Sequence, residues 1–163
     1  MGGRKTLARS INESIYLYIV FVGSFALVGS YLVDLGNGVY RIMKRHYGAV
    51  IVKDDVIIAT GYNGSPRGQE NCCDVGMCHR MLLPSNSGDY AQCHSVHAEQ
   101  NAIIAAERGK MLGATLYLAG EEFIKEEFDN NKYAYKRMEV CVPRPVCQRM
   151  IDNSGIVEVV GSK

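Results

Sequence analysis

Two short segments hold the residues with the clearest capacity for chemistry. His97 and Glu99 flank Ala98, and Cys147 follows the proline-containing run 143–146. Neutral imidazole and thiolate are zinc ligands, and zinc brings the pKa of a bound water close to neutrality. A carboxylate beside that water, but not on the metal, can carry its proton to a leaving group. The residue types therefore predict a hydrolytic zinc site, with His97 and Cys147 as ligands and Glu99 as the proton carrier.

The spacing of these residues sets conditions on the elements that carry them. Residues two apart diverge in the middle of a helix, so His97 and Glu99 can face one site only if His97 stands at a helix start. Residues 98–108 are strong helix formers and Gly109 is a typical helix end. A second helix is predicted over 146–152, ending near Gly155. We therefore expect a metal ligand at the beginning of each helix.

Arg144 departs from the motif that these segments otherwise follow. Zinc-dependent nucleobase deaminases carry H-x-E and then P-C-x-x-C, and Arg144 stands where the first of those two cysteines belongs. A guanidinium offers only donors, so it cannot bind zinc, and its charge repels the cation. Either Cys141 supplies the third thiolate, or His97 and Cys147 hold zinc weakly. We expect the second outcome, with reduced zinc affinity and activity.

The remaining elements are read from alternating and apolar runs. Residues 49–64 predict a hairpin of two apolar strands around Asp54-Asp55, which closes in the turn-rich segment 62–64. Further strands are predicted over 114–118 and 156–160. Residues 121–136 are charged and aromatic and are predicted to form a solvated insertion loop. This order of strands and helices is typical of an α/β sandwich.

From about Tyr47 to Val160 the chain resembles the deoxycytidylate (dCMP) deaminases of the zinc-dependent cytidine deaminase superfamily. The resemblance is carried by the segment GYNGSPRG at 61–68, the pair Asn71-Cys72, Cys93 with residues 97–103, and residues 147–156. It implies a three-layer α/β sandwich with a five-stranded mixed sheet. It also implies zinc-dependent hydrolysis of dCMP to dUMP by a homo-oligomer, with Asn63 at the nucleotide sugar and Ala98 among the substrate-binding residues.

Two other functions stay open at this stage. Because of Arg144, the chain could be a catalytically impaired homologue that binds nucleotide or assembles with partners. It could also deaminate another base or a nucleic acid, although a net charge of +1 argues against binding to nucleic acid polymers. A basic cluster, formed by Arg41, Lys44, Arg45 and His46, is either a solvated face or a contact for the nucleotide phosphate.

The cysteines point to a second metal site. The chain has six, and the resemblance places Cys72, Cys78 and Cys93 in zinc-binding surroundings, which favours reduced thiols in the cytoplasm over disulfides. A structural zinc needs four ligands, and Cys73 or His94 is a candidate fourth. Relatives commonly carry a further cysteine where this chain has Ile42. The alternative is a set of buried free thiols without metal.

The N-terminal region allows three interpretations. Residues 1–13 are interpreted as a tail and 14–163 as the deaminase domain. Residues 14–33 hold no charged side chain, and about 20 apolar residues suffice to span a bilayer. A cleaved signal peptide is also conceivable. We expect a buried first helix that covers the sheet, its outer face hidden in an oligomer, with a membrane anchor as the alternative to a cytoplasmic protein.

Overall fold

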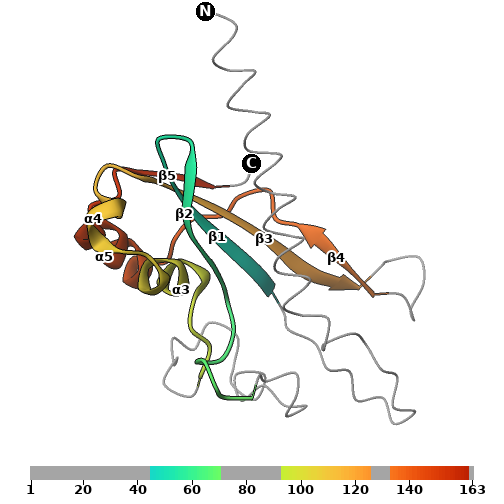
Figure 1. The fold of residues 1–163 in the computed structure, drawn as a ribbon. Helices are drawn as coiled ribbons and strands as arrows, with labels where there is room; N and C mark the ends of the chain where they lie inside the picture. The colour runs from blue at the N-terminus through green and yellow to red at the C-terminus, as the bar shows by residue number, and fades with distance from the viewer. Residues whose placement is uncertain (1–44, 71–92, 126–132, 162–163) are drawn as a thin grey trace, which may run out of the picture.

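The computed structural model describes residues 45–70, 93–125 and 133–161 and has a mixed α/β fold (Figure 1). Its elements, in chain order, are β1 Arg45–Lys53, β2 Val56–Tyr62, α3 Ala98–Ala105, α4 Arg108–Met111, β3 Thr115–Lys125, β4 Tyr133–Arg137, α5 Pro145–Ser154 and β5 Glu158–Gly161. The predicted order of strands and helices is therefore present within these residues.

The sheet is mixed, with the order β2-β1-β3-β4 and with β5 also paired to β3. Strand β1 is antiparallel to both β2 and β3, and β5 runs parallel to β3. The first half of β3 pairs with β5 and its second half with β4, so these two strands share one edge. The mixed α/β sheet is confirmed. Five strands side by side and a three-layer sandwich stay predictions, because the described residues form a sheet four strands wide.

The predicted hairpin is confirmed. Lys53 pairs with Val56, which leaves Asp54 and Asp55 as the two residues of the turn. Both have left-handed backbone angles, with φ of 49° and 61°. Two-residue turns of this hand match the twist of the strands, and aspartate tolerates the conformation better than most residues. The hairpin fixes the register of β1 and β2, and helix α3 packs on these two strands.

Residues 121–125 and 133–136, predicted to belong to a loop, are strands instead, and 126–132 lie outside the described residues. Strand β3 continues to Lys125, and β4 pairs antiparallel with it over Glu121–Lys125 and Tyr133–Arg137. The charged side chains that suggested a loop are compatible with a partly exposed strand end, where Glu122 forms an ion pair with Arg45 of β1 at 2.8 Å. The charged composition of this segment favoured a solvated loop. Pairing between strands, which composition does not reveal, instead places these residues in the sheet.

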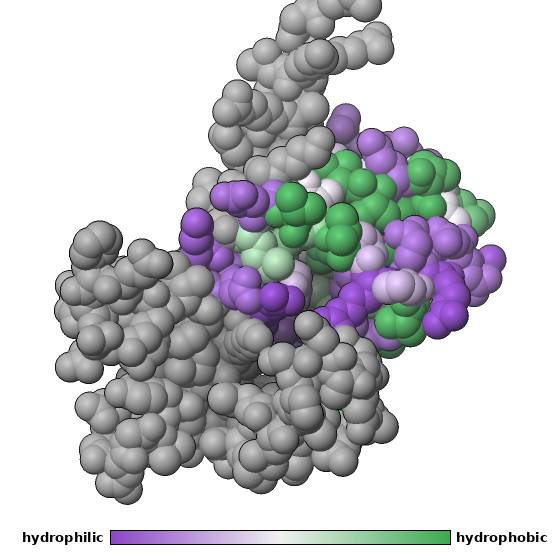
Figure 2. Space-filling view, turned by 180° about the vertical axis from the view of Figure 1, so that it is seen from behind, coloured by the Kyte–Doolittle hydropathy of each residue, from purple (hydrophilic) through white to green (hydrophobic). Residues whose placement is uncertain are grey.

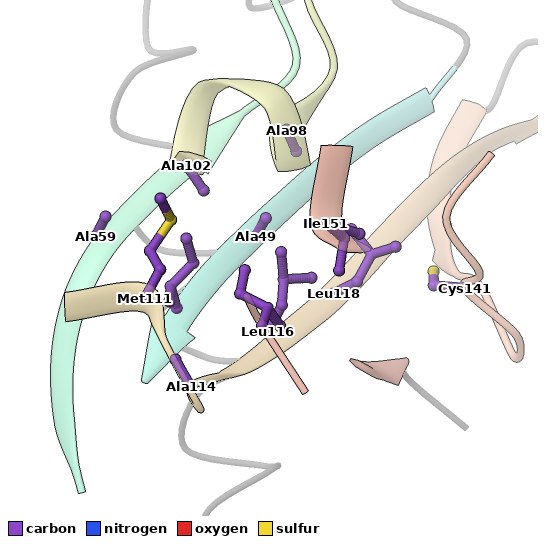
Figure 3. Close-up of a cluster of buried hydrophobic side chains, with 12 residues drawn as sticks. Ala49, Ala59, Ala98, Ala102, Met111, Ala114, Leu116, Leu118, Cys141 and Ile151 are labelled. Atoms are coloured by element: carbon purple, nitrogen blue, oxygen red, sulfur yellow. The ribbon is translucent and has the colours of Figure 1, made fainter. Parts of the chain in front are cut away.

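The helices α3, α4 and α5 gather on one side of the sheet (Figure 1). Figure 3 shows the core between them, where Ala98 and Ala102 of α3, Met111 and Ile151 meet Leu116 and Leu118 of β3. On β1, alternate residues such as Ala49 and Ile51 point into this core. The buried Val50 and Ala119 belong to a second cluster on the opposite face.

The helix boundaries differ from the predicted ones in one case. Helix α3 ends at Ala105, and Gly109 lies inside the short helix α4 instead of ending α3. The ion pair of Glu107 with Lys110, at 3.0 Å, stabilises this extra turn. Helix α5 ends as predicted, because Gly155 takes the left-handed conformation with φ of 86° that closes helices.

Some large apolar side chains stay exposed on the single chain, among them Val56, Val142 and Val157. Figure 2 shows hydrophobic residues beside strongly hydrophilic ones over the described part of the surface. Within that part, no helix combines the length and apolar character needed to cross a bilayer. Residues 1–13 and 14–33, and with them the tail, first-helix and membrane-anchor readings, lie outside the described residues. Oligomerisation likewise stays a prediction.

Candidate metal centre and active site

The start of α3 is fixed by contacts on both sides of His97. One residue earlier, Val96 forms a β-bridge with Gly64, with N–O distances of 2.8 and 3.1 Å. The backbone N–H of His97 donates to the side chain of Gln100 at 3.0 Å. His97 is therefore the N-cap, and Glu99 lies in the first turn, 5% exposed. This placement confirms that His97 stands at a helix start, where both side chains can face one site.

A glycine lets α3 lie directly on the sheet. A Cβ on Gly61 of β2 would sit 2.3 Å from both the backbone N of Ala102 and the backbone O of Ala98. No side chain fits in that space, so only glycine permits this approach. The side chain of Asn101 then donates to the backbone O of Tyr62 at 2.8 Å. Strand β2 thus sets the position of the helix that carries His97 and Glu99.

The second helix brings Cys147 to the same place. Arg144 is the N-cap of α5 and Pro145 its first residue, where proline is well suited because it needs no N–H partner. Cys147 lies in the first turn and is fully buried. Its Sγ is 3.0 Å from Nδ1 of His97. The starts of α3 and α5 therefore converge, and both present their positive dipole ends to the same spot.

His97, Glu99 and Cys147 each offer a donor atom, and these three atoms lie within 4.8 Å of one another. In zinc sites, ligand bonds of about 2.0–2.3 Å hold donors roughly 3.5 Å apart, so the group needs only a small adjustment. Burial, and after it the Glu99 carboxylate, raises the pKa of the Cys147 thiol to about 12. A thiolate there needs a nearby cation, and the donor set of imidazole, thiolate and carboxylate fits zinc.

Neither Arg144 nor Cys141 supplies a third thiolate to this group of donors. The backbone of Arg144 caps α5, and the nearby guanidinium acts on the pKa of Cys147 in the lowering direction, against burial. Cys141 is a buried core residue that lies apart from Ala98, beyond Ile151 and Leu118 in Figure 3. It does not belong to the donor group found among the described residues. Its role as a zinc ligand stays a prediction.

Of the expected substrate contacts, Ala98 directly follows His97, and Asn63 directly precedes Gly64, which bridges to Val96. Asn63 follows β2, and its Oδ1 accepts from the backbone N of Tyr47 at 2.6 Å. Its Nδ2 donates to the backbone O of Arg45 at 3.0 Å. Ala98 is the first residue of α3 and fully buried. Asn63 therefore already joins the loop after β2 to β1, and a contact with the nucleotide sugar stays a prediction.

The structure describes little of the second metal site. Cys93 is half-buried with a free thiol, and His94 is exposed. Cys72, Cys73 and Cys78 lie outside the described residues, so the site stays a prediction. Of the basic cluster, Arg45 is engaged by Glu122, and burial lowers the pKa of the half-buried His46. Arg41 and Lys44 also lie outside the described residues.

Sequence reasoning did not identify two residues that position the centre. Gly61 entered the sequence interpretation only as part of the hairpin segment 49–64 and of the segment 61–68 that carries the resemblance, although glycine inside a strand signals close approach of another backbone. Gln100 holds the N-cap, and a glutamine three residues after a capping residue is a known signature. The capping residue of that signature is usually serine or threonine. Because histidine takes its place here, the sequence did not indicate the role of Gln100.

Comparison with known proteins adds to this geometry. The family model for the cytidine and deoxycytidylate deaminase zinc-binding region matches residues 30–163. A deoxycytidylate deaminase of Schizosaccharomyces pombe is 37% identical over 119 residues, which cover 72% of this chain and 30% of that protein. A deoxycytidylate deaminase of Mycobacterium phage D29 is 35% identical over 126 residues, covering 74% and 80%.

Among solved structures, a dCMP deaminase from cyanophage S-TIM5, in complex with dCMP and dUMP, aligns with 91% of this chain and 80% of its own. Its TM-score is 0.45 and its sequence identity 22%. The chain thus spans most of the two phage proteins but only 30% of the length of the S. pombe protein.

Proposed function

This chain belongs to the cytidine and deoxycytidylate deaminase family, and on that premise we propose that it hydrolyses dCMP to dUMP at a zinc centre. The observation that carries the proposal is the convergence of His97, Glu99 and Cys147 at the starts of α3 and α5. The relatives named deoxycytidylate deaminase, at 35–37% identity, support dCMP as the substrate.

His97 and Cys147 would hold the zinc ion. Both come from helix starts, where fixed backbone dipoles orient the ligands. When bound, zinc supplies a water that ionises near neutral pH. Arg144 supplies no ligand and brings a positive charge close to the centre, so we expect weaker zinc binding than a site with two cysteines would give.

Glu99 would move the proton. Its carboxylate is 5% exposed and lies in the first turn of α3, beside both proposed ligands. An Oε atom of a buried carboxylate in this position can accept a proton from the reacting water. It can then donate that proton to the amino group that leaves as ammonia. The wall formed by Ala98 and the core behind it exclude bulk water from that side of the centre.

Asn63 and Ala98 would orient the nucleotide. Asn63 is held by two hydrogen bonds to the backbone of β1, which leaves its amide rigid. A rigid amide loses little entropy when it also binds a sugar hydroxyl. The backbone N–H of Ala98, in the first turn of α3, has no partner within its own helix and is suited to a base carbonyl.

A substrate panel tests the proposal. The purified chain, supplied with zinc, should convert dCMP to dUMP with a kcat/KM well above its values for CMP, deoxycytidine and single-stranded DNA. Addition of a zinc chelator should stop the reaction, and returning zinc should restore it. A chain that binds zinc yet prefers a nucleic acid or a free nucleoside would contradict the proposed substrate.

A further inference from the structure

We propose that in the unmodified chain the Glu99 carboxylate is itself the third protein ligand of the zinc ion. The inference rests on the proposed function, because it assigns a second role to the residue proposed to carry the proton. It replaces the expected histidine and two thiolates with a histidine, a thiolate and a carboxylate.

The donor geometry carries this inference. The carboxylate of Glu99 belongs to the group whose ligand atoms all lie within 4.8 Å of one another, together with His97 and Cys147. Residues at the N-cap and in the first turn of α3 supply two of these donors, and the facing turn of α5 supplies the third. Aspartate and glutamate oxygens bind zinc at about 2.0–2.2 Å, so the three donors would reach one ion after a small adjustment of their side chains.

No other described residue takes the vacant position. Arg144 stands in the place of the ligand and has donors only. Cys141 is buried in the core and outside the group of donors. Cys93 and His94 are described as well and also do not belong to it. Among the residues that the structure describes, Glu99 is the single further donor within reach of both proposed ligands.

Burial adds a second reason. Glu99 and Ser154 are the two buried polar or charged residues of the described part of the chain. A buried carboxylate requires a compensating partner, and a divalent cation is a strong one. In this structure the Cys147 thiol is the hydrogen-bond partner of that carboxylate. A thiol loses its proton when it binds zinc, so a bound ion would replace that proton as the partner of both groups.

The arrangement has a consequence for catalysis. A carboxylate bound to the metal would be a weaker base, because the cation beside it favours the charged, unprotonated form. Zinc binding would therefore compete with proton transfer for Glu99, and turnover would be fastest when the carboxylate is not bound to the ion. A thiolate at position 144 would remove this competition, because it would complete the site without Glu99.

A double-mutant cycle on zinc affinity tests the proposal. The dissociation constant for zinc is measured by chelator competition for the unmodified chain, E99Q, R144C and the double variant. We expect E99Q to weaken zinc binding about ten-fold or more in the unmodified chain. In the R144C chain, the same change should alter affinity by less than about three-fold. E107Q, which removes an exposed carboxylate outside the donor group, is the control for loss of negative charge.

Substitution with Co²⁺ provides a readout that does not depend on turnover. The visible d–d bands should change between the unmodified chain and E99Q, but not between R144C and its E99Q derivative. Equal zinc affinity of the unmodified chain and E99Q would overturn the ligand assignment, as would an equal loss in both backgrounds. A failure of the proposed function gives a different result: the R144C variant would bind zinc but would not deaminate dCMP.

Discussion

Nδ1 of His97 lies 3.0 Å from Sγ of Cys147, although 50 residues separate the two in the chain. The contact joins the N-cap of α3 to the first turn of α5. Each helix start is fixed separately, α3 by Gly61 and the bridge of Val96 to Gly64, and α5 by Arg144 and Pro145. Contacts within the fold therefore position both sides of the centre.

Replacing Arg144 with cysteine should strengthen the centre. Arg144→Cys removes a positive charge and adds a thiolate three residues before Cys147, so zinc affinity should rise roughly ten-fold or more. The kcat/KM for dCMP should rise with it. Arg144→Ser is the matched control, because it removes the charge without adding a strong ligand. If both variants bind zinc as the unmodified chain does, Arg144 does not limit the site.

The proton-carrying role of Glu99 is tested best where the metal site is complete. In the Arg144→Cys background, Glu99→Gln should keep zinc and lose about 10²–10⁴-fold in kcat, because an amide cannot accept the proton. Turnover of dCMP and zinc content are measured on the same samples. Wild-type turnover in the Glu99→Gln derivative would remove Glu99 from the proposed chemistry.

Gly61 should be intolerant of any side chain. Gly61→Ala places a Cβ against the backbone of Ala98 and Ala102, so α3 must shift, at a cost of about 1–3 kcal/mol in the free energy of unfolding. Zinc affinity should fall as well, because α3 carries His97. Gly109→Ala is the control, since a Cβ there meets nothing within 4 Å and alanine favours the helix. Equal unfolding midpoints for the two variants would contradict the packing described here.

Asn63 is predicted to serve both the fold and the substrate. Asn63→Ala removes hydrogen bonds to the backbone of Arg45 and Tyr47 and should lower the free energy of unfolding by roughly 1–3 kcal/mol. The KM for dCMP should rise if the same amide binds the sugar. Denaturant unfolding and dCMP kinetics separate the two effects. A less stable variant with an unchanged KM would limit Asn63 to a structural role.

The elements that hold the chemistry were predictable because their signals are local. The H-x-E spacing demanded a helix start at His97, and the structure has one there. The Asp54-Asp55 turn and the glycine end of α5 at Gly155 follow equally from neighbouring residues. These features depend on backbone angles and helix caps that a few consecutive residues determine.

Other features depend on pairing between distant segments, which a single sequence does not reveal. Glu122 appeared to belong to a charged loop until its pairing with Arg45 made it part of a strand. The backbone contact of Gly61 with α3 likewise joins residues about 40 apart. The approach of Glu99 to Cys147 also joins distant segments, but here the two-part motif H-x-E and P-C-x-x-C predicted it.

The most direct test of the central claim is zinc content per chain, measured together with dCMP turnover. His97→Ala is analysed in parallel, so that zinc held elsewhere, for example by Cys72, Cys78 and Cys93, is subtracted. We expect the unmodified chain to hold about one zinc ion more per chain than His97→Ala at saturating metal. The formation of dUMP should rise in proportion to this additional zinc. Equal zinc content in both proteins, or dUMP formation that does not depend on this zinc, would contradict the account.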